Sequence, residues 1–132
     1  HMVVSHDGRT LYVSGNQSGL VGRYDLAAVV QALKAAGAQR VAGPGGRSLS
    51  VGMGVRTIEL SPDQRSLYAA INNEAKLVKV DLASWSVVAR SDVDPFTVGL
   101  AVSPDGKTIV TTSQGREMVG GYSVGLYRDS AR

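Results

Sequence analysis

Apolar residues along this chain gather in short segments, and glycine, proline, aspartate or serine bounds each segment. Two of the segments, residues 67–71 and 100–102, are apolar at successive positions rather than at alternate ones. A strand with both faces buried shows this pattern, because neither of its faces meets water. The pattern therefore predicts short β-strands in sheets that are packed between other sheets.

One turn phrase occurs three times, as Ser-His-Asp-Gly from Ser5, Ser-Pro-Asp-Gln from Ser61 and Ser-Pro-Asp-Gly from Ser103. Serine and aspartate bond to the backbone of such a turn, and glycine takes a left-handed position that closes a hairpin. Two copies depart from the pattern, with His6 in place of proline and Gln64 in place of glycine. A left-handed glutamine costs roughly 1 kcal/mol. We interpret the following residues as structural turn residues: Asp7, Gly8, Pro62, Asp63, Pro104, Asp105 and Gly106.

The spacing of the turns predicts the architecture. Ser61 and Ser103 are 42 positions apart, and a propeller blade spans ~40–45 residues. Third strands are predicted at residues 21–26 and 77–82, and a fourth strand at residues 85–90. This order is that of the four-stranded antiparallel blade of a β-propeller. We therefore expect an all-β partial propeller over residues 3–132, with blades at about residues 3–42, 55–92 and 97–128, the last one incomplete. His1-Met2 is interpreted as a cloning scar.

The first interval between turns is longer than the second, and residues 26–37 account for the excess. Leu26, Val29, Val30 and Leu33 recur at helical spacing. Asp25 suits the helix start, and Gly37 suits its end. The pattern predicts one short helical insert against a rim of the propeller.

The C-terminal part of the chain leaves two registers open. Residues 114–121 are rich in glycine and predict a long loop. The third strand of the last blade then falls at residues 123–128, or in the alternative register at residues 119–124.

The chain resembles the YVTN-type β-propeller repeats, a branch of the seven-bladed propellers of bacteria and archaea. The resemblance rests on the three Ser-x-Asp phrases, on the Tyr-Asp-Leu and Val-Asp-Leu strand ends at Asp25 and Asp81, and on the stretch from Val98 to Lys107. Members of the family are often exported or displayed on the cell surface. The resemblance therefore implies a periplasmic, secreted or cell-surface protein.

The composition limits the class of protein but does not indicate a function. The 132 residues are 43% hydrophobic, which suffices for a core, and cysteine is absent, which excludes disulfides. The net charge is only +3 and the basic residues are scattered, so charge alone is weak evidence for nucleic acid. No apolar stretch approaches the ~18 residues of a membrane span.

Candidate site residues are few. Arg56 opens the innermost strand of the second blade, where a guanidinium can bind an anion or a partner carboxylate, or form a salt bridge between blades. Arg47 and Arg40 are further candidates for ligand binding. Arg47 belongs to the glycine-rich stretch 43–48, which otherwise reads as an inter-blade loop. Asp92 and Asp94 form the only candidate pair for a weak calcium site, and we expect no cofactor.

The sequence contains no Gly-x-Ser-x-Gly, His-Glu-x-x-His or phosphate-loop motif. The favoured interpretation is a non-catalytic propeller module that recognises a protein or another macromolecule through its rim loops and channel mouth. One alternative is part of a propeller enzyme of lactonase, lyase or redox type, with its catalytic residues in missing blades. Another is a module that binds single-stranded nucleic acid. The expected partners are the remaining blades of a longer propeller, or a second copy of the chain that completes the ring.

Overall fold

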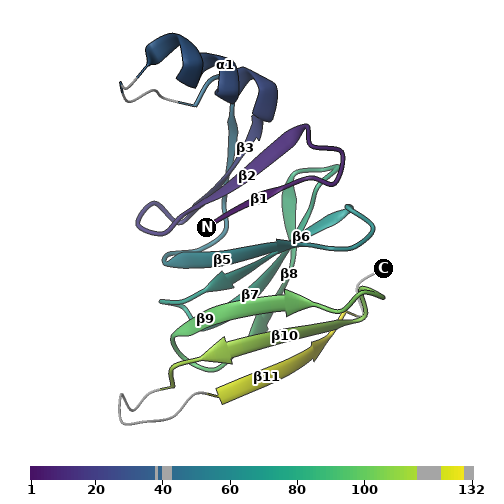
Figure 1. Ribbon diagram of the computed structural model, residues 1–132. Helices are drawn as coiled ribbons and strands as arrows, with labels where there is room; N and C mark the ends of the chain where they lie inside the picture. The colour runs from purple at the N-terminus through teal and green to yellow at the C-terminus, as the bar shows by residue number, and fades with distance from the viewer. Residues whose placement is uncertain (38, 40–42, 116–122, 130–132) are drawn as a thin grey trace.

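Three antiparallel sheets follow one another along the chain (Figure 1). The computed structural model describes residues 1–132 except 38, 40–42, 116–122 and 130–132. The first sheet, blade 1, contains β1 (Met2–Val4), β2 (Thr10–Gly15), β3 (Leu20–Asp25) and β4 (Arg47–Ser50). Blade 2 contains β5 (Val55–Leu60), β6 (Ser66–Ile71), β7 (Lys76–Asp81) and β8 (Ser86–Asp92). Blade 3 contains β9 (Thr97–Val102), β10 (Thr108–Ser113) and β11 (Ser123–Arg128).

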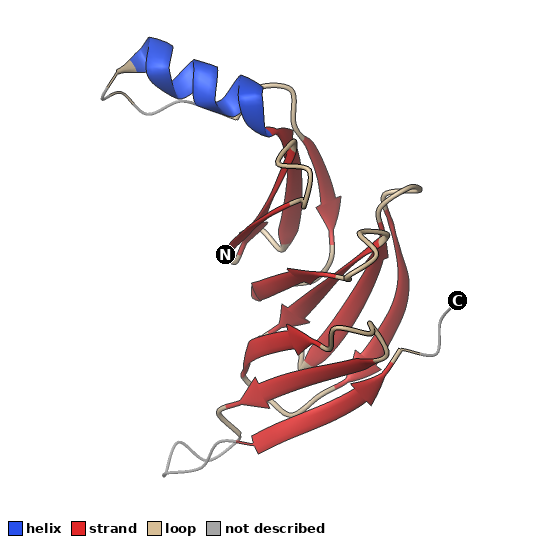
Figure 2. Cartoon of the chain, turned by 45° about the vertical axis from the view of Figure 1, so that its right-hand side comes forward, coloured by secondary structure: helices blue, strands red, loops and turns tan. Residues whose placement is uncertain are grey.

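Strands that are consecutive in sequence are neighbours in each sheet, and every pair is antiparallel. The blades stack face to face, and β5 at the edge of blade 2 contacts both β1 and β9 (Figure 2). This arrangement confirms the predicted fold class: an all-β partial propeller of three blades with one short helix. In the part of the chain that is described, blade 3 has three strands.

The helix α1 (Leu26–Ala36) has the limits that its capping residues predict. The Asp25 side chain accepts a hydrogen bond from the backbone N–H of Ala28 at 2.9 Å, and Gly37 follows the helix with φ of 61°. Such a carboxylate cap satisfies one of the free N–H groups of the first turn. The helix packs against β3 and lies beyond blade 1 (Figure 1). None of its side chains is buried, so it covers little of the propeller.

Blade 1 continues beyond the limit of about residue 42 that the sequence suggested. The chain returns from α1 to form β4, which pairs with β3 so that Val21 lies opposite Leu49. Residues 47 and 48 therefore lie in a strand and not in an inter-blade loop. The predicted cloning scar also takes part in the fold, because Met2 pairs with Val13 in β1.

The register of the last strand is settled by its pairing. Ile109 of β10 lies opposite Tyr127 of β11, and the strand occupies residues 123–128. The alternative strand at residues 119–124 is therefore wrong. Most of the predicted loop at residues 114–121 lies outside the described residues.

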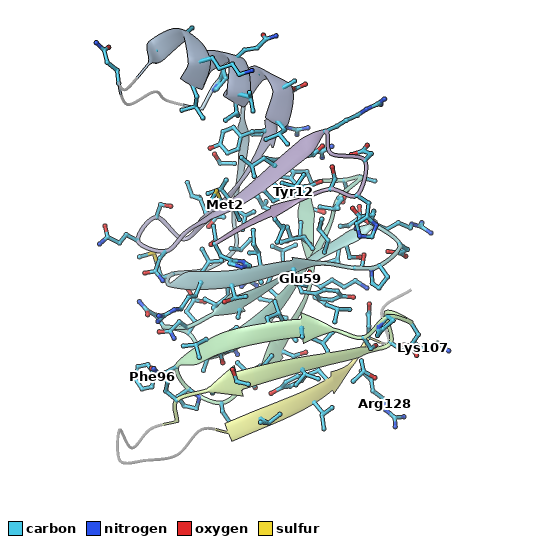
Figure 3. The ribbon with its side chains drawn as sticks, in the orientation of Figure 1. Met2, Tyr12, Glu59, Phe96, Lys107 and Arg128 are labelled. Atoms are coloured by element: carbon cyan, nitrogen blue, oxygen red, sulfur yellow. The ribbon has the colours of Figure 1, made fainter. Side chains whose placement is uncertain are left out.

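The three hairpin turns, at residues 5–8, 61–64 and 103–106, lie at one end of the sheets, here called the turn end (Figure 1). Lys107 and Arg128 mark this end of blade 3, and Phe96 marks the opposite end (Figure 3). Each turn has the same internal bonds, because the serine Oγ donates to the aspartate Oδ1 at 2.6 Å in all three copies. The fourth residues, Gly8, Gln64 and Gly106, have φ of 71°, 59° and 71°.

Buried side chains lie mainly between the blades. Leu67 and Val80 of blade 2 belong to the cluster shared with blade 1, whereas Tyr68 and Leu77 belong to the cluster shared with blade 3. Both faces of blade 2 are thus covered by another sheet. This explains why β6 is apolar at successive positions.

Candidate binding groove at the turn end

The arginines singled out from the sequence are not brought together. Arg56 is exposed in β5, and its carbonyl oxygen accepts a hydrogen bond from the Ser14 Oγ at 2.8 Å. Arg47 is exposed at the start of β4, the last strand in the order of blade 1. Arg40 lies outside the described residues. Arg56 and Arg47 therefore belong to different strands of different blades.

The aspartate pair considered for calcium has other partners. Lys76 forms an ion pair with Asp92, and the backbone carbonyl of Asp94 accepts hydrogen bonds from Thr97 and Ser113. Both aspartates border an open depression of about 570 Å³ together with Glu74. Across the residues that the structure describes, no group of three or more His, Cys, Asp or Glu side chains is arranged to hold a metal ion.

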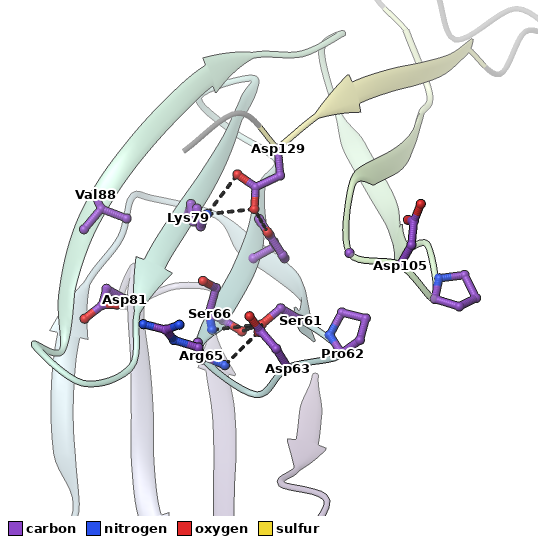
Figure 4. Close-up of a pocket in the computed structure, with 13 residues that line it drawn as sticks. Ser61, Pro62, Asp63, Arg65, Ser66, Lys79, Asp81, Val88, Asp105 and Asp129 are labelled. Atoms are coloured by element: carbon purple, nitrogen blue, oxygen red, sulfur yellow. Dashed lines mark hydrogen bonds and ion pairs between the residues drawn. The ribbon is translucent and has the colours of Figure 1, made fainter. Parts of the chain in front are cut away.

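A larger groove of about 810 Å³ opens between the second and third hairpin turns (Figure 4). It lies between blades 2 and 3 because equivalent turns of successive blades project from the same end. Turn residues and strand residues of both blades line it: Ser61, Pro62, Asp63, Arg65, Ser66, Tyr68, Lys79, Asp81, Val88, Pro104, Asp105, Gly106 and Asp129. Several residues predicted to be structural in the turns thus also form the wall of this groove.

A polar triad joins the two blades beside the groove. The Lys79 ammonium lies 2.8 and 2.7 Å from the two carboxylate oxygens of Asp129. The Tyr68 hydroxyl donates a hydrogen bond to the same carboxylate, and Lys79 lies 5.9 Å from the centre of the Tyr68 ring. The Lys79 and Asp129 side chains are only 14% and 15% exposed. Their ion pair is therefore less screened than one on the open surface.

Burial and the hydrogen bond to Asp129 raise the pKa of the Tyr68 hydroxyl well above its ordinary value. A buried phenol resists ionisation because its charged form loses solvation, and the neighbouring negative charge opposes a second one. Tyr68 therefore stays neutral and acts as a hydrogen-bond donor in this triad.

The turn aspartates bring negative charge to the groove. The hydrogen bond from Ser61 lowers the pKa of Asp63 below its usual value, and the bond from Ser103 does the same for Asp105. The pKa of Asp81 is also lowered, chiefly by the backbone N–H of Ser84. Hydrogen bonds to a carboxylate favour its charged form. Four lining side chains are carboxylates and two, Arg65 and Lys79, are cations, so the groove is acidic although the whole chain is basic.

The gap between the first and second turns is bridged differently. Gln64 Oε1 accepts a hydrogen bond from the backbone N–H of His6 at 2.9 Å. In the third turn the position of Gln64 is taken by Gly106, and a Cβ atom there would lie 3.5 Å from the Cδ of Pro62. The missing side chain leaves the groove between the second and third turns open.

Sequence reasoning found the turn residues of the groove and interpreted Tyr68 as a core or blade-contact residue, which its burial beside Ile109 agrees with, but it did not name Lys79 and Asp129. A signal for them was present, because Tyr12 pairs with Arg23 across β2 and β3 just as Tyr68 pairs with Lys79 across β6 and β7. An aromatic residue opposite a cation at the same place in two repeats indicates a common inter-blade contact.

Comparison with known proteins gives the fold. No family model matches the chain, and no curated protein matches its sequence. Among solved structures, hydrazine synthase of Kuenenia stuttgartiensis is similar, with a TM-score of 0.74, 25% identity and 96% of this chain covered. A 6-phosphogluconolactonase-like protein of Bacteroides uniformis has a TM-score of 0.71 and 14% identity, again over 96% of this chain.

Both neighbours are β-propeller-like proteins. The fold is that of a β-propeller. The chain spans 33% of the first neighbour and 36% of the second, so the likeness covers about a third of each. Membership of the YVTN-type repeats stays a prediction. The helix among the described residues is too short to cross a membrane.

Proposed function

We propose that this chain is a non-catalytic binding module, and that its groove between blades 2 and 3 recognises a basic segment of a partner protein. The observation that carries the proposal is the set of ionised carboxylates held by the turns around a groove of about 810 Å³. Their positions are fixed by hydrogen bonds before any partner arrives, so binding costs little ordering of the groove.

The acceptor atoms suit a cationic side chain. In Asp63 both turn bonds, from Ser61 and from the N–H of Arg65, end on Oδ1. Asp105 has the same arrangement with Ser103 and Lys107. The Oδ2 atoms of both aspartates can therefore accept hydrogen bonds from an ammonium or guanidinium group.

Apolar groups beside these carboxylates suit the rest of such a side chain. Pro62 and Pro104 line the groove, and Val88, which is exposed, lines it from β8. Lysine and arginine carry long apolar stems that pack on such surfaces while the charged end stays hydrated. An acidic groove repels phosphates, so single-stranded nucleic acid is disfavoured as its ligand.

The test uses a fluorescently labelled hexalysine peptide and measures its anisotropy at low ionic strength. The double variant Asp63→Asn/Asp105→Asn keeps an acceptor oxygen for each turn but removes two charges. We expect it to weaken binding about threefold or more, since each exposed charge pair contributes up to ~1 kcal/mol.

Asp7→Asn is the matched control, because Asp7 accepts the same two turn bonds in blade 1 and does not line the groove. It should bind the peptide as the unmodified chain does. Equal weakening by Asp7→Asn and by the double variant would contradict the proposal, since the attraction would then be a property of the whole surface.

A second candidate function is a part of a propeller enzyme, and the names of both structural neighbours favour it. If the catalytic groups lie in further blades, this chain alone does not react; if the groove takes part, its carboxylates are the acid–base groups. The test is lactone hydrolysis by the purified chain, followed as acid release. Hydrolysis above the spontaneous rate that Asp63→Asn/Asp105→Asn abolishes would replace the binding role with a catalytic one.

A further inference from the structure

The two contacts between blades are built from equivalent residues. In blades 1 and 2, a tyrosine of the second strand lies opposite a cation of the third strand, as Tyr12 with Arg23 and Tyr68 with Lys79. Each cation then reaches the residue that follows the third strand of the next blade. Arg23 donates to the carbonyl oxygen of Leu82 at 2.9 Å, and Lys79 binds the Asp129 carboxylate.

Blade 3 carries an apolar version of the same face. The positions of the tyrosine and the cation are taken by Val110 and Leu126, which lie opposite each other. Leu126 is 72% exposed, and Val124 on the same face is 64% exposed. Ala101 of β9 lies opposite Val110 and extends the apolar surface to β9, the first strand of this blade. A soluble protein rarely leaves such a sheet face in water.

Blade 1 carries the complementary face. Leu67 and Ile109 pack against the preceding blade, and Leu11 is their equivalent in blade 1. Tyr24 lies opposite Leu11, and its ring covers Gly22 in the way that the Tyr127 ring covers Gly125. On this face Met2 is 64% exposed and Val4 is 44% exposed.

The residues that would meet across these two faces are apolar on both sides. Leu26 in blade 1 is the equivalent of Leu82 in blade 2 and of Asp129 in blade 3. In each blade the backbone N–H of this residue donates to the carbonyl oxygen of the residue that follows the hairpin turn, which is Arg9, Arg65 and Lys107, respectively. Leu126 would therefore meet a leucine. Where the contacts inside the chain pair a cation with an oxygen, this contact pairs two apolar side chains.

We infer that the apolar face of blade 3 binds blade 1 of a second copy of this chain, in the register of the two contacts inside the chain. Two such contacts join two copies head to tail. The result is a six-bladed ring, within the range of about four to eight blades that propellers adopt. The inference rests on the geometry between blades and not on the proposed function of the groove.

The test is the solution mass of the full chain by light scattering over a range of concentrations. We expect twice the chain mass of 13.8 kDa. Leu126→Asp on blade 3 and Val4→Arg on blade 1 should each give the mass of one chain, because each places a charge among apolar side chains. An aspartate, unlike the cations Arg23 and Lys79 at the equivalent positions, cannot donate to a facing carbonyl oxygen. Met53→Arg is the matched control, since Met53 is exposed between β4 and β5 beside Gly19 and Glu74. It should leave the dimer intact.

A single-chain mass for the unmodified protein at every concentration would overturn the inference. So would a dimer broken by Leu126→Asp but not by Val4→Arg, because that result means that blade 3 binds blade 3. Circular dichroism checks that each variant is folded, and Val124→Asp replaces Leu126→Asp if the latter is not. Hexalysine binding separates the two proposals: a monomer that still binds the peptide through Asp63 and Asp105 overturns only the ring.

Discussion

The backbone N–H of His6 donates a hydrogen bond to the side-chain oxygen of Gln64 at 2.9 Å. These two residues are the two departures from the repeated turn phrase, and they meet across the contact between blades 1 and 2. Proline at the His6 position, as in Pro62 and Pro104, has no N–H to donate. Glutamine at the glycine position supplies the acceptor, and its Nε2 also donates to the Ser61 carbonyl at 3.1 Å. Each departure therefore explains the other.

Substitutions of Gln64 separate backbone strain from these hydrogen bonds. Gln64→Ala removes both bonds and keeps a side chain at φ of 59°, whereas Gln64→Gly removes the same bonds and relieves the left-handed strain. We expect the glycine variant to be about 1 kcal/mol more stable than the alanine variant. Urea denaturation measures the difference. An alanine variant at least as stable as the glycine variant would mean that the turn does not need a left-handed residue.

Arg23 should stabilise the contact between blades 1 and 2. Its guanidinium donates to the Leu82 carbonyl and lies 5.6 Å from the centre of the Trp85 ring. Arg23→Met keeps the apolar stem and loses both interactions, so we expect a loss of about 1–2 kcal/mol. The fluorescence of Trp85, the single tryptophan, reports unfolding at this contact. Arg9→Met, in an exposed turn, should change stability by less than about 0.5 kcal/mol; an equal loss in both variants would contradict the role of Arg23.

Tyr68 should make the stability of the protein fall in alkaline solution. Its pKa in the folded protein is raised above the ordinary value of 10.0. The folded state therefore holds this proton more tightly than the unfolded state does. The resulting stabilisation is complete below pH 10 and is lost as the pH rises toward the folded pKa. Tyrosinate absorbance should show one tyrosine that ionises last, and Tyr68→Phe should remove that component. Its persistence in the variant would assign the raised pKa to another tyrosine.

Gly106 should control access to the groove. Gly106→Gln places a side chain beside Pro62, where the proline nitrogen cannot donate the bond that His6 donates to Gln64. We expect this variant to weaken hexalysine binding by partly filling the groove. Gly8→Gln introduces the same left-handed strain, about 1 kcal/mol, in the first turn, where a Cβ meets nothing within 4 Å. It should leave binding unchanged, and equal weakening by both variants would refute a blocking effect.

Local patterns predicted the parts of the fold that local interactions build. The turns follow from serine and aspartate side chains that bond within four residues, and α1 follows from Asp25 and Gly37 at its ends. The strand β4 was not predicted because α1 separates it from β3. It is also short, and only Leu49 in it is partly buried.

The candidate groove was less accessible to sequence reasoning, because its residues come from two blades. Lys79 and Asp129 are 50 positions apart, and the pattern within one blade does not show that a cation of its third strand reaches the residue after the third strand of the next blade. Arg56 was favoured for its place on an innermost strand. That argument could not show which charges gather elsewhere.

The groove between the second and third turns binds a cationic segment in the function that we propose. A titration of the isotopically labelled chain with hexalysine, followed through the amide chemical shifts of its NMR spectrum, tests this residue by residue. We expect shifts concentrated at residues 61–66 and 103–106, with the equivalent turn at residues 5–8 unchanged. Shifts of equal size in all three turns, or none in the second and third, would contradict it.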